Sequence, residues 1–198
     1  MEQVKKNIDV AMRRTKADLV LKNARFINVF TENVDRGDIA IADDTIIGIG
    51  EYSGIIEIDC SDLYVAPGFI DAHVHIESSM IMPKQFGEVV IKKGITTIIA
   101  DPHEIANVEG IEGVKAMIES SKEAPIDIFF MLPSCVPATK FEDSGHILNV
   151  EDLEELIDNN CVLGLGEVMD IPSVLNKDEK LLKKIDMAKK KHIDGHCP

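Results

Sequence analysis

The chain has 198 residues, of which 45% are hydrophobic, so it can bury a core and suits one domain or one domain with a small companion. Its 35 acidic residues outnumber 21 Lys and Arg, and the formal net charge of -14 repels nucleic-acid phosphates and anionic lipid headgroups. The apolar runs fall short of the roughly 20 residues of a membrane span, and residues 1–14 lack the apolar core of a signal peptide. We therefore predict a cytoplasmic protein that binds neither nucleic acid nor membrane.

The first third of the chain predicts a small β-rich unit, residues 1–66. A charged segment, residues 1–16, is expected to form a loose helix. Short β-rich pieces follow at 17–30, 37–50 and 54–60, and turn residues separate them. This succession of short strands predicts an antiparallel β unit.

After residue 66 the pattern alternates between strands and helices. The expected strands cover residues 68–75, 95–101, 126–132, 161–168 and 192–196, and the expected helices cover residues 83–94, 111–122, 150–160 and 178–190. Alternating strands and helices predict an α/β fold with a parallel sheet. The second and third strands are almost continuously apolar, as expected of strands that are covered on both faces.

The helices carry local signals of their own. Val114, Met117 and Ile118 continue an apolar stripe from Ile111, as in an amphipathic surface helix. Pro83 suits the first turn of a helix, and Gly94 is placed to end that helix in a left-handed conformation.

Polar residues follow the carboxyl ends of all five expected strands. They are His73 and His75, Asp101 to Glu104, Ser134 and Cys135, Glu167, and His196. Parallel α/β folds build their active sites at this edge of the sheet. The sequence therefore predicts that these side chains gather at one site.

The pattern at this site favours a metal ion. His73 and His75 are two residues apart on a strand, so they share a face about 6–7 Å apart and can both reach one ion at about 2.1 Å. Glu167 ends an apolar strand, where an unpaired buried carboxylate is costly and a nearby cation compensates it. A lone His-x-His pair also occurs by chance. His146 and His192 are interpreted as solvated or packing residues.

The cysteines predict no further site. Cys60, Cys135, Cys161 and Cys197 are far apart without C-x-x-C spacing, which argues against a disulfide framework and a structural zinc site. We expect reduced, mostly buried thiols. For Cys135 a ligand role is the alternative to a small buried thiol.

Five motifs in order carry a resemblance: "APGFIDAHVHIESSM", "ADPHEIANV", "LPSCVPAT", "GLGEVM" and "DGHCP". From about Leu19 to the last residue, the chain resembles the adenine deaminase family of the metal-dependent amidohydrolase superfamily. The resemblance implies a (β/α)8 TIM-type barrel that bears the metal site. It also implies a small β-sandwich, to which residues 18–66 contribute. The implied organisation is an N-terminal segment and sandwich portion at 1–66, followed by the first five β/α units at 67–198.

The resemblance also implies the ligand set. His73 and His75 are implied metal ligands from the first barrel strand, Glu167 is the bridging carboxylate from the fourth, and His196 comes from the fifth. Many superfamily members use a carboxylated lysine at the bridging position, whereas adenine deaminases have a glutamate. The implied cofactor is a divalent metal, binuclear in a complete enzyme; manganese or iron is favoured and zinc suits the same ligands.

The implied reaction is hydrolytic deamination of adenine to hypoxanthine and ammonia, a step of purine salvage and adenine catabolism. Glu77 projects beyond the metal, where dihydroorotases carry an arginine, and a carboxylate there suits a neutral ring with N–H donors. His103 and Glu104 are candidates for holding the purine or moving protons, the alternative being a structural loop role. Asp71 is expected to orient the histidines or pack beneath them.

The chain also departs from the family pattern. A complete barrel takes about 250 residues, and only five of its eight strands are recognised here, without the strand-six histidine and strand-eight aspartate that the resemblance implies. We therefore expect the 198-residue chain alone to be inactive or nearly so, and to form a homo-oligomer or be poorly soluble because its sheet edge is open. The alternatives are a non-catalytic remnant and an amidohydrolase acting on another cyclic amide, which Glu77 disfavours.

Overall fold

The structure is a computed structural model and describes residues 1–196, so Cys197 lies outside the described residues. The chain divides into two compact units, Met1–Pro67 and a second unit that begins at Gly68. Each unit has its own hydrophobic core. Among the described residues, no helix has the length and apolar character to cross a membrane.

The first unit begins with the expected helix and continues as one sheet. Its elements are α1 (Glu2–Ala11), β1 (Ala17–Asn28), β2 (Asn33–Ala42), β3 (Thr45–Gly50), β4 (Gly54–Asp59) and β5 (Tyr64–Val65). The strand order is β3-β2-β1-β4, and β5 also pairs with β1. Residues 1–67 thus form a single five-stranded sheet, and the predicted β-sandwich is not confirmed.

The predicted antiparallel arrangement of this unit is partly wrong. β2 pairs antiparallel with both β1 and β3, as hairpins do, but β4 and β5 run parallel to β1. The reason is that β3 and β4 lie at opposite edges of the sheet, so the chain crosses from one edge to the other between them. Parallel neighbours cannot be joined by a two-residue hairpin, and β4 accordingly pairs with β1, which is not its neighbour in the chain.

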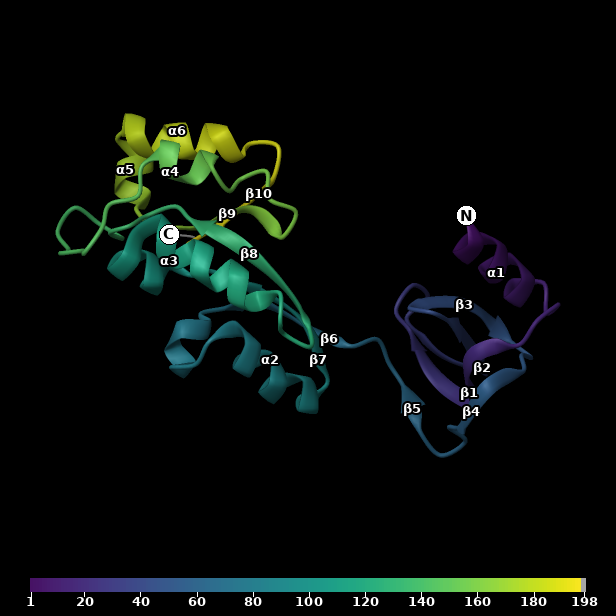
Figure 1. The fold of residues 1–198 in the computed structure, drawn as a ribbon. Coiled ribbons are helices and arrows are strands. Elements are labelled where there is room, and N and C mark those ends of the chain that lie inside the picture. The colour runs from purple at the N-terminus through teal and green to yellow at the C-terminus, as the bar shows by residue number, and fades with distance from the viewer. Residues whose placement is uncertain (197–198) are drawn as a thin grey trace. The chain divides into compact units, whose positions relative to one another are not determined.

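The second unit is built on a curled parallel sheet. Its strands are β6 (Phe69–Val74), β7 (Ile95–Ala100), β8 (Asp127–Pro133), β9 (Val162–Val168) and β10 (His192–Gly195), adjacent in chain order (Figure 1). The connections contain η1 (Ile76–Ser79), α2 (Pro83–Val90), η2 (Ile91–Lys93), α3 (His103–Ser121), α4 (Val150–Glu154), α5 (Ile171–Leu175) and α6 (Glu179–Ala188). This α/β unit is half of a TIM-type barrel, in agreement with the predicted incomplete barrel.

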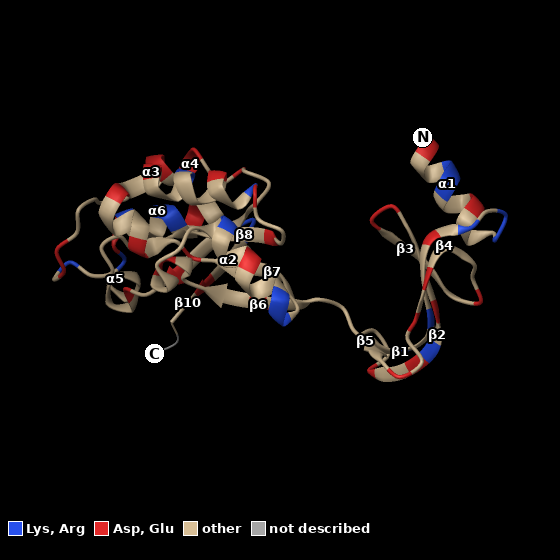
Figure 2. Ribbon diagram, turned by 60° about the horizontal axis from the view of Figure 1, so that its bottom comes forward, with Lys and Arg blue, Asp and Glu red and all other residues tan. Residues whose placement is uncertain are grey.

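Apolar residues from the strands and helices form the core of this unit. Ile98, Phe130 and Leu165 are fully buried on β7, β8 and β9, and they pack in one cluster with Val114 and Met117 of α3. The predicted apolar stripe of α3 is therefore confirmed. Acidic residues lie along α3 and α4 on the outside of this layer (Figure 2).

The helix bounds differ from prediction where local signals were weak. α3 begins at His103 rather than at Ile111, because a first helical segment precedes a break at Gly110, whose φ is 63°. α4 ends at Glu154, and α5 was not predicted. Pro83 does begin α2, and Gly94 ends the following 3-10 turn with a φ of 86°, as expected.

Candidate metal centre

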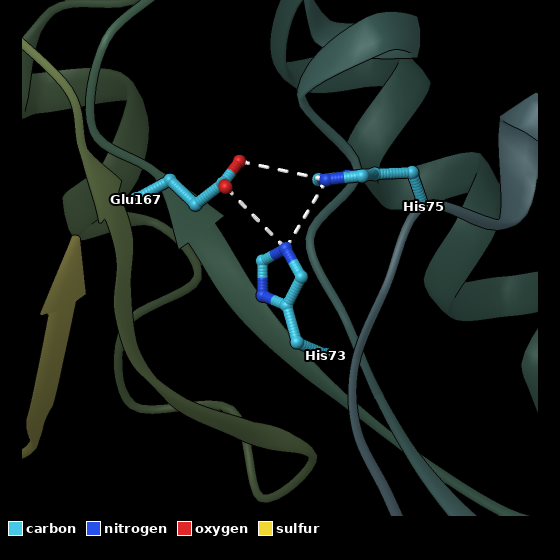
Figure 3. Close-up of side chains that lie close together, drawn as sticks. All are labelled: His73, His75 and Glu167. Carbon is cyan, nitrogen blue, oxygen red and sulfur yellow. Dashed lines mark hydrogen bonds and ion pairs between the residues drawn. The ribbon is translucent and has the colours of Figure 1, made fainter. Parts of the chain in front are cut away.

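Two histidines at the end of β6 direct their rings at one point. His73 Nε2 and His75 Nε2 are 3.1 Å apart (Figure 3). His75 Nδ1 lies 2.9 Å from the carbonyl oxygen of Asp101, and a carbonyl only accepts, so Nδ1 carries the proton. This contact leaves the lone pair of His75 Nε2 available to a metal, as in many metal sites. Asp71 Oδ1 accepts a hydrogen bond from the backbone N–H of His73 at 3.3 Å.

The carboxylate of Glu167 faces both rings from β9. Glu167 Oε1 is 3.4 Å from His73 Nε2, and Oε2 is 3.6 Å from His75 Nε2 (Figure 3). One ligand atom from each of these residues lies within 4.8 Å of the others. His196, which follows β10, places Nε2 3.4 Å from Glu167 Oε1. Imidazole nitrogens around a carboxylate are a donor set that suits zinc, manganese or iron, so these residues fit a divalent metal.

The strand that carries Glu167 is shaped by the glycines that precede it. A Cβ on Gly164 would lie 1.8 Å from the carbonyl oxygen of His192 on β10. A Cβ on Gly166 would lie 2.3 Å from Asp101 Oδ2. The two glycines therefore let β9 approach its neighbours closely. Glu167 itself has a φ of 33°, a left-handed conformation that costs a residue with a Cβ about 1–2 kcal/mol.

A second group of ligand atoms surrounds the start of α3. His103 Nδ1 lies 3.4 Å from Asp101 Oδ1 and 3.1 Å from Glu167 Oε2. Glu104 Oε1 is 3.8 Å from His103 Nε2, and Glu104 Oε2 is 3.5 Å from His75 Nδ1. Sequence reasoning gave Asp101 no role of its own, although a carboxylate directly after an apolar strand was a usable signal. The first turn of α3, rather than a loop, holds His103 and Glu104.

Electrostatics in this group favour a positive charge. Asp101 is 1% exposed, and within residues 1–196 neither of its carboxylate oxygens has a hydrogen-bond partner. Burial raises the pKa of Asp101. The Asp101 carboxylate in turn raises the pKa of His103 to about 9, although partial burial opposes that shift. A cation beside these carboxylates would compensate their burial.

Glu77 joins the same region from η1, directly after β6. Its Oε1 accepts a hydrogen bond from the N–H of Ile105 at 3.2 Å, which ties it to the first turn of α3. Its Oε2 is buried and has no hydrogen-bond partner among the described residues. Burial raises the pKa of Glu77. One oxygen of Glu77 therefore anchors the helix and the other is available to a ligand.

Other residues considered from the sequence lie apart from these groups. His146 is exposed in the connection after β8, and His192 is exposed at the start of β10. Cys135 is buried, and it belongs to none of the three groups of possible ligand atoms in the described part of the chain. Cys60, Cys135 and Cys161 are free thiols, as predicted.

Residues 64–197 match the amidohydrolase family. The chain belongs to this family. It is similar to the adenine deaminase of Clostridium acetobutylicum, with 57% identity over 197 residues, covering 98% of this chain and 35% of that protein. The adenine deaminase of Ligilactobacillus salivarius is 52% identical over 196 residues, covering 98% of this chain and 34% of that protein. The chain thus spans about a third of the length of these curated relatives.

Two solved structures have a similar fold. A D-aminoacylase matches with a TM-score of 0.61 and 15% identity, over 91% of this chain and 45% of that one. The atrazine chlorohydrolase of Arthrobacter aurescens TC1 complexed with zinc also has a TM-score of 0.61, with 16% identity over 87% of this chain and 51% of that one. At these identities the likeness concerns the fold alone.

The pKa of His103 predicts a pH dependence of stability in the metal-free protein. Its folded-state pKa of about 9 lies above the ordinary value of 6.5, so the stabilisation is fully present below pH 6.5 and is lost as the pH rises through about 9. His103→Gln should remove this pH dependence. In wild type it changes the free energy of unfolding by about 3 kcal/mol at most over that pH range. Urea unfolding of chelator-treated protein between pH 6 and pH 10 measures it. His146→Gln, at an exposed histidine, should keep the wild-type slope, and an unchanged slope in His103→Gln would contradict the prediction.

Proposed function

We propose that the complete protein carrying this chain is a metal-dependent adenine deaminase, which hydrolyses adenine to hypoxanthine and ammonia. The observation that carries the proposal is the convergence of His73, His75 and Glu167 at the strand ends of a chain 57% identical to a protein named adenine deaminase. This convergence supports the proposed metal site, and the identity supports the proposed substrate class.

His73, His75, Glu167 and His196 would hold the metal. Bound there, a divalent metal lowers the pKa of water and so provides hydroxide near neutral pH. The chain's own contribution is to fix the ligands: the carbonyl of Asp101 sets the tautomer of His75, and Glu167 presents one oxygen toward each of His73 and His75. Of the metals these ligands suit, we propose manganese or iron in a binuclear site, with zinc as the alternative.

Glu77, His103 and Glu104 would bind the purine. The unpartnered Oε2 of Glu77 can accept an N–H of a neutral ring, a contact that an anionic substrate would not make. His103 has Nδ1 beside Asp101 and Glu167, which leaves Nε2 for a substrate or a proton. Glu104 Oε2 is buried without a hydrogen-bond partner among residues 1–196, and we propose that this oxygen accepts a proton or an N–H during deamination.

Several finer features belong to the same proposal. Deamination of adenine would place the protein in purine salvage and adenine catabolism. We propose that the sheet of residues 1–67 is one part of a β-sandwich that further chain completes. A cytoplasmic location and self-association stay predictions.

An assay on the intact, manganese-loaded protein tests the reaction. We expect release of one ammonia per hypoxanthine formed from adenine, and no ring opening of a cyclic amide such as dihydroorotate. Ammonia release and the ultraviolet spectrum of the purine measure the two products. Turnover of the cyclic amide without turnover of adenine would overturn the proposed substrate class.

Glu167→Ala tests the ligand set. Without this carboxylate the site loses the group that faces both His73 and His75, so the protein should lose most of its bound metal while staying folded. Elemental analysis measures the metal, and thermal unfolding checks the fold. Glu109→Ala, at an exposed glutamate of α3, is the matched control and should keep its metal. Full occupancy in Glu167→Ala would contradict the assignment.

Glu77→Gln tests substrate recognition. Glutamine can still accept the N–H of Ile105, so the start of α3 should hold, but it replaces the second acceptor oxygen by a donor. We expect adenine turnover at least about tenfold lower with unchanged metal content. Glu88→Gln, on the exposed side of α2, is the control. If the rate of Glu77→Gln equals that of wild type, Glu77 does no more than anchor the helix.

A further inference from the structure

β9 carries a β-bulge at the residue that faces the histidines. β10 pairs Ile193 with Leu165 and Gly195 with Val168, and the register shifts between these two pairs. Between them β9 has Gly166 and Glu167, whereas β10 has Asp194 alone. Two residues of one strand opposite one residue of its neighbour form a β-bulge. A bulge changes the direction of a side chain and leaves backbone groups without their regular hydrogen bonds between strands. The φ of 33° at Glu167 belongs to this irregularity.

Side chains from both neighbouring strands replace the missing ladder contacts of Glu167. Asp194 Oδ1 accepts a hydrogen bond from the Glu167 N–H at 2.7 Å. The hydroxyl of Ser134, which follows β8, donates to the Glu167 carbonyl oxygen at 2.8 Å. The peptide groups on both sides of the Glu167 Cα are thus fixed, one by β10 and the other by the end of β8.

Ser134 is itself held in place by buried groups. It is 1% exposed, and its N–H donates to the Gly166 carbonyl oxygen at 3.3 Å. The Ser134 carbonyl oxygen accepts a hydrogen bond from Lys184 Nζ of α6 at 2.7 Å, and Lys184 is 6% exposed. Buried lysines are rare because burying the ammonium group costs free energy. The Ser134 carbonyl oxygen offsets part of this cost by accepting the hydrogen bond. The contact links α6 to the backbone that carries Glu167.

We propose that Asp194 and Ser134 are positioning residues that hold the bulge and thereby aim the Glu167 carboxylate at the metal. The proposal rests on the proposed function, in which Glu167 is a ligand. A carboxylate moves with its own backbone, and the left-handed conformation of Glu167 persists only where the surroundings over-determine it. Asp194 acts as a hydrogen-bond acceptor in this account, and its negative charge is not required.

Substitutions at Asp194 distinguish its role as a hydrogen-bond acceptor from the effect of its negative charge. Asp194→Leu removes the acceptor with little change in size, so we expect the affinity of the intact, chelator-stripped protein for Mn²⁺ to fall about 10–100-fold. Asp194→Asn keeps an oxygen that can accept the Glu167 N–H, so its affinity should stay close to wild type. Electron paramagnetic resonance of free Mn²⁺ during titration measures both. Asp186→Leu, at an exposed aspartate of α6, is the control.

Ser134→Ala is the second variant and keeps the proposal testable if Asp194→Leu does not fold. It removes only a hydroxyl and should also weaken Mn²⁺ binding, while Ser144→Ala, in the same connection after β8, should not. Wild-type affinity in a folded Asp194→Leu, or in Ser134→Ala, would overturn the proposal. Equal losses in Asp194→Asn and Asp194→Leu would overturn it as well, because the charge would then be what matters.

Glu167→Ala, measured in the same titration, distinguishes a wrong ligand assignment for Glu167 from a wrong positioning role for Asp194 and Ser134. If Glu167→Ala keeps wild-type Mn²⁺ affinity, Glu167 is not a ligand and the proposed function fails at this residue. If Glu167→Ala loses affinity but the Asp194 and Ser134 variants do not, the ligand assignment stands and the positioning role fails.

Discussion

The site depends on the contacts that the Glu167 carboxylate makes with histidine rings. Its two oxygens lie within 3.6 Å of ring nitrogens of His73, His75, His103 and His196. These histidines come from three other strand ends or the residues that follow them, so the contacts exist only if the sheet delivers all of them to one edge. A single carboxylate among several imidazoles is a compact donor set of the kind that holds a divalent metal.

The parallel sheet meets this requirement by simple geometry. β6 to β10 are adjacent in chain order and run in one direction, so their carboxyl ends share an edge. Buried Phe130 and Leu165 on the strands and Met117 on α3 anchor the helices to the sheet. Because the core fixes the strands, residues far apart in sequence meet at that edge. This is the architecture of the amidohydrolase family, to which the chain belongs.

The site concentrates negative charge, and that concentration has a chemical consequence. Glu77, Asp101 and Glu104 contribute buried oxygens without hydrogen-bond partners in the part of the chain that the structure describes. Buried carboxylate oxygens without hydrogen bonds cost free energy, which a cation or a ligand with N–H donors compensates. In the proposed function, a metal beside Glu167 and a purine with N–H donors beside Glu77 would compensate part of this cost.

The sequence by itself determined the α/β pattern, the His73–His75 pair and the position of Glu167 at a strand end, because each depends on spacing within a few residues. It also predicted antiparallel pairing near the N-terminus, which holds for β1, β2 and β3, whose partners are neighbours in the chain. Only the tertiary structure decided that β4 joins the far edge of its sheet, that α3 begins at His103, and that Asp194 holds the backbone of Glu167. These features depend on contacts between segments distant in sequence, and no local periodicity encodes such contacts.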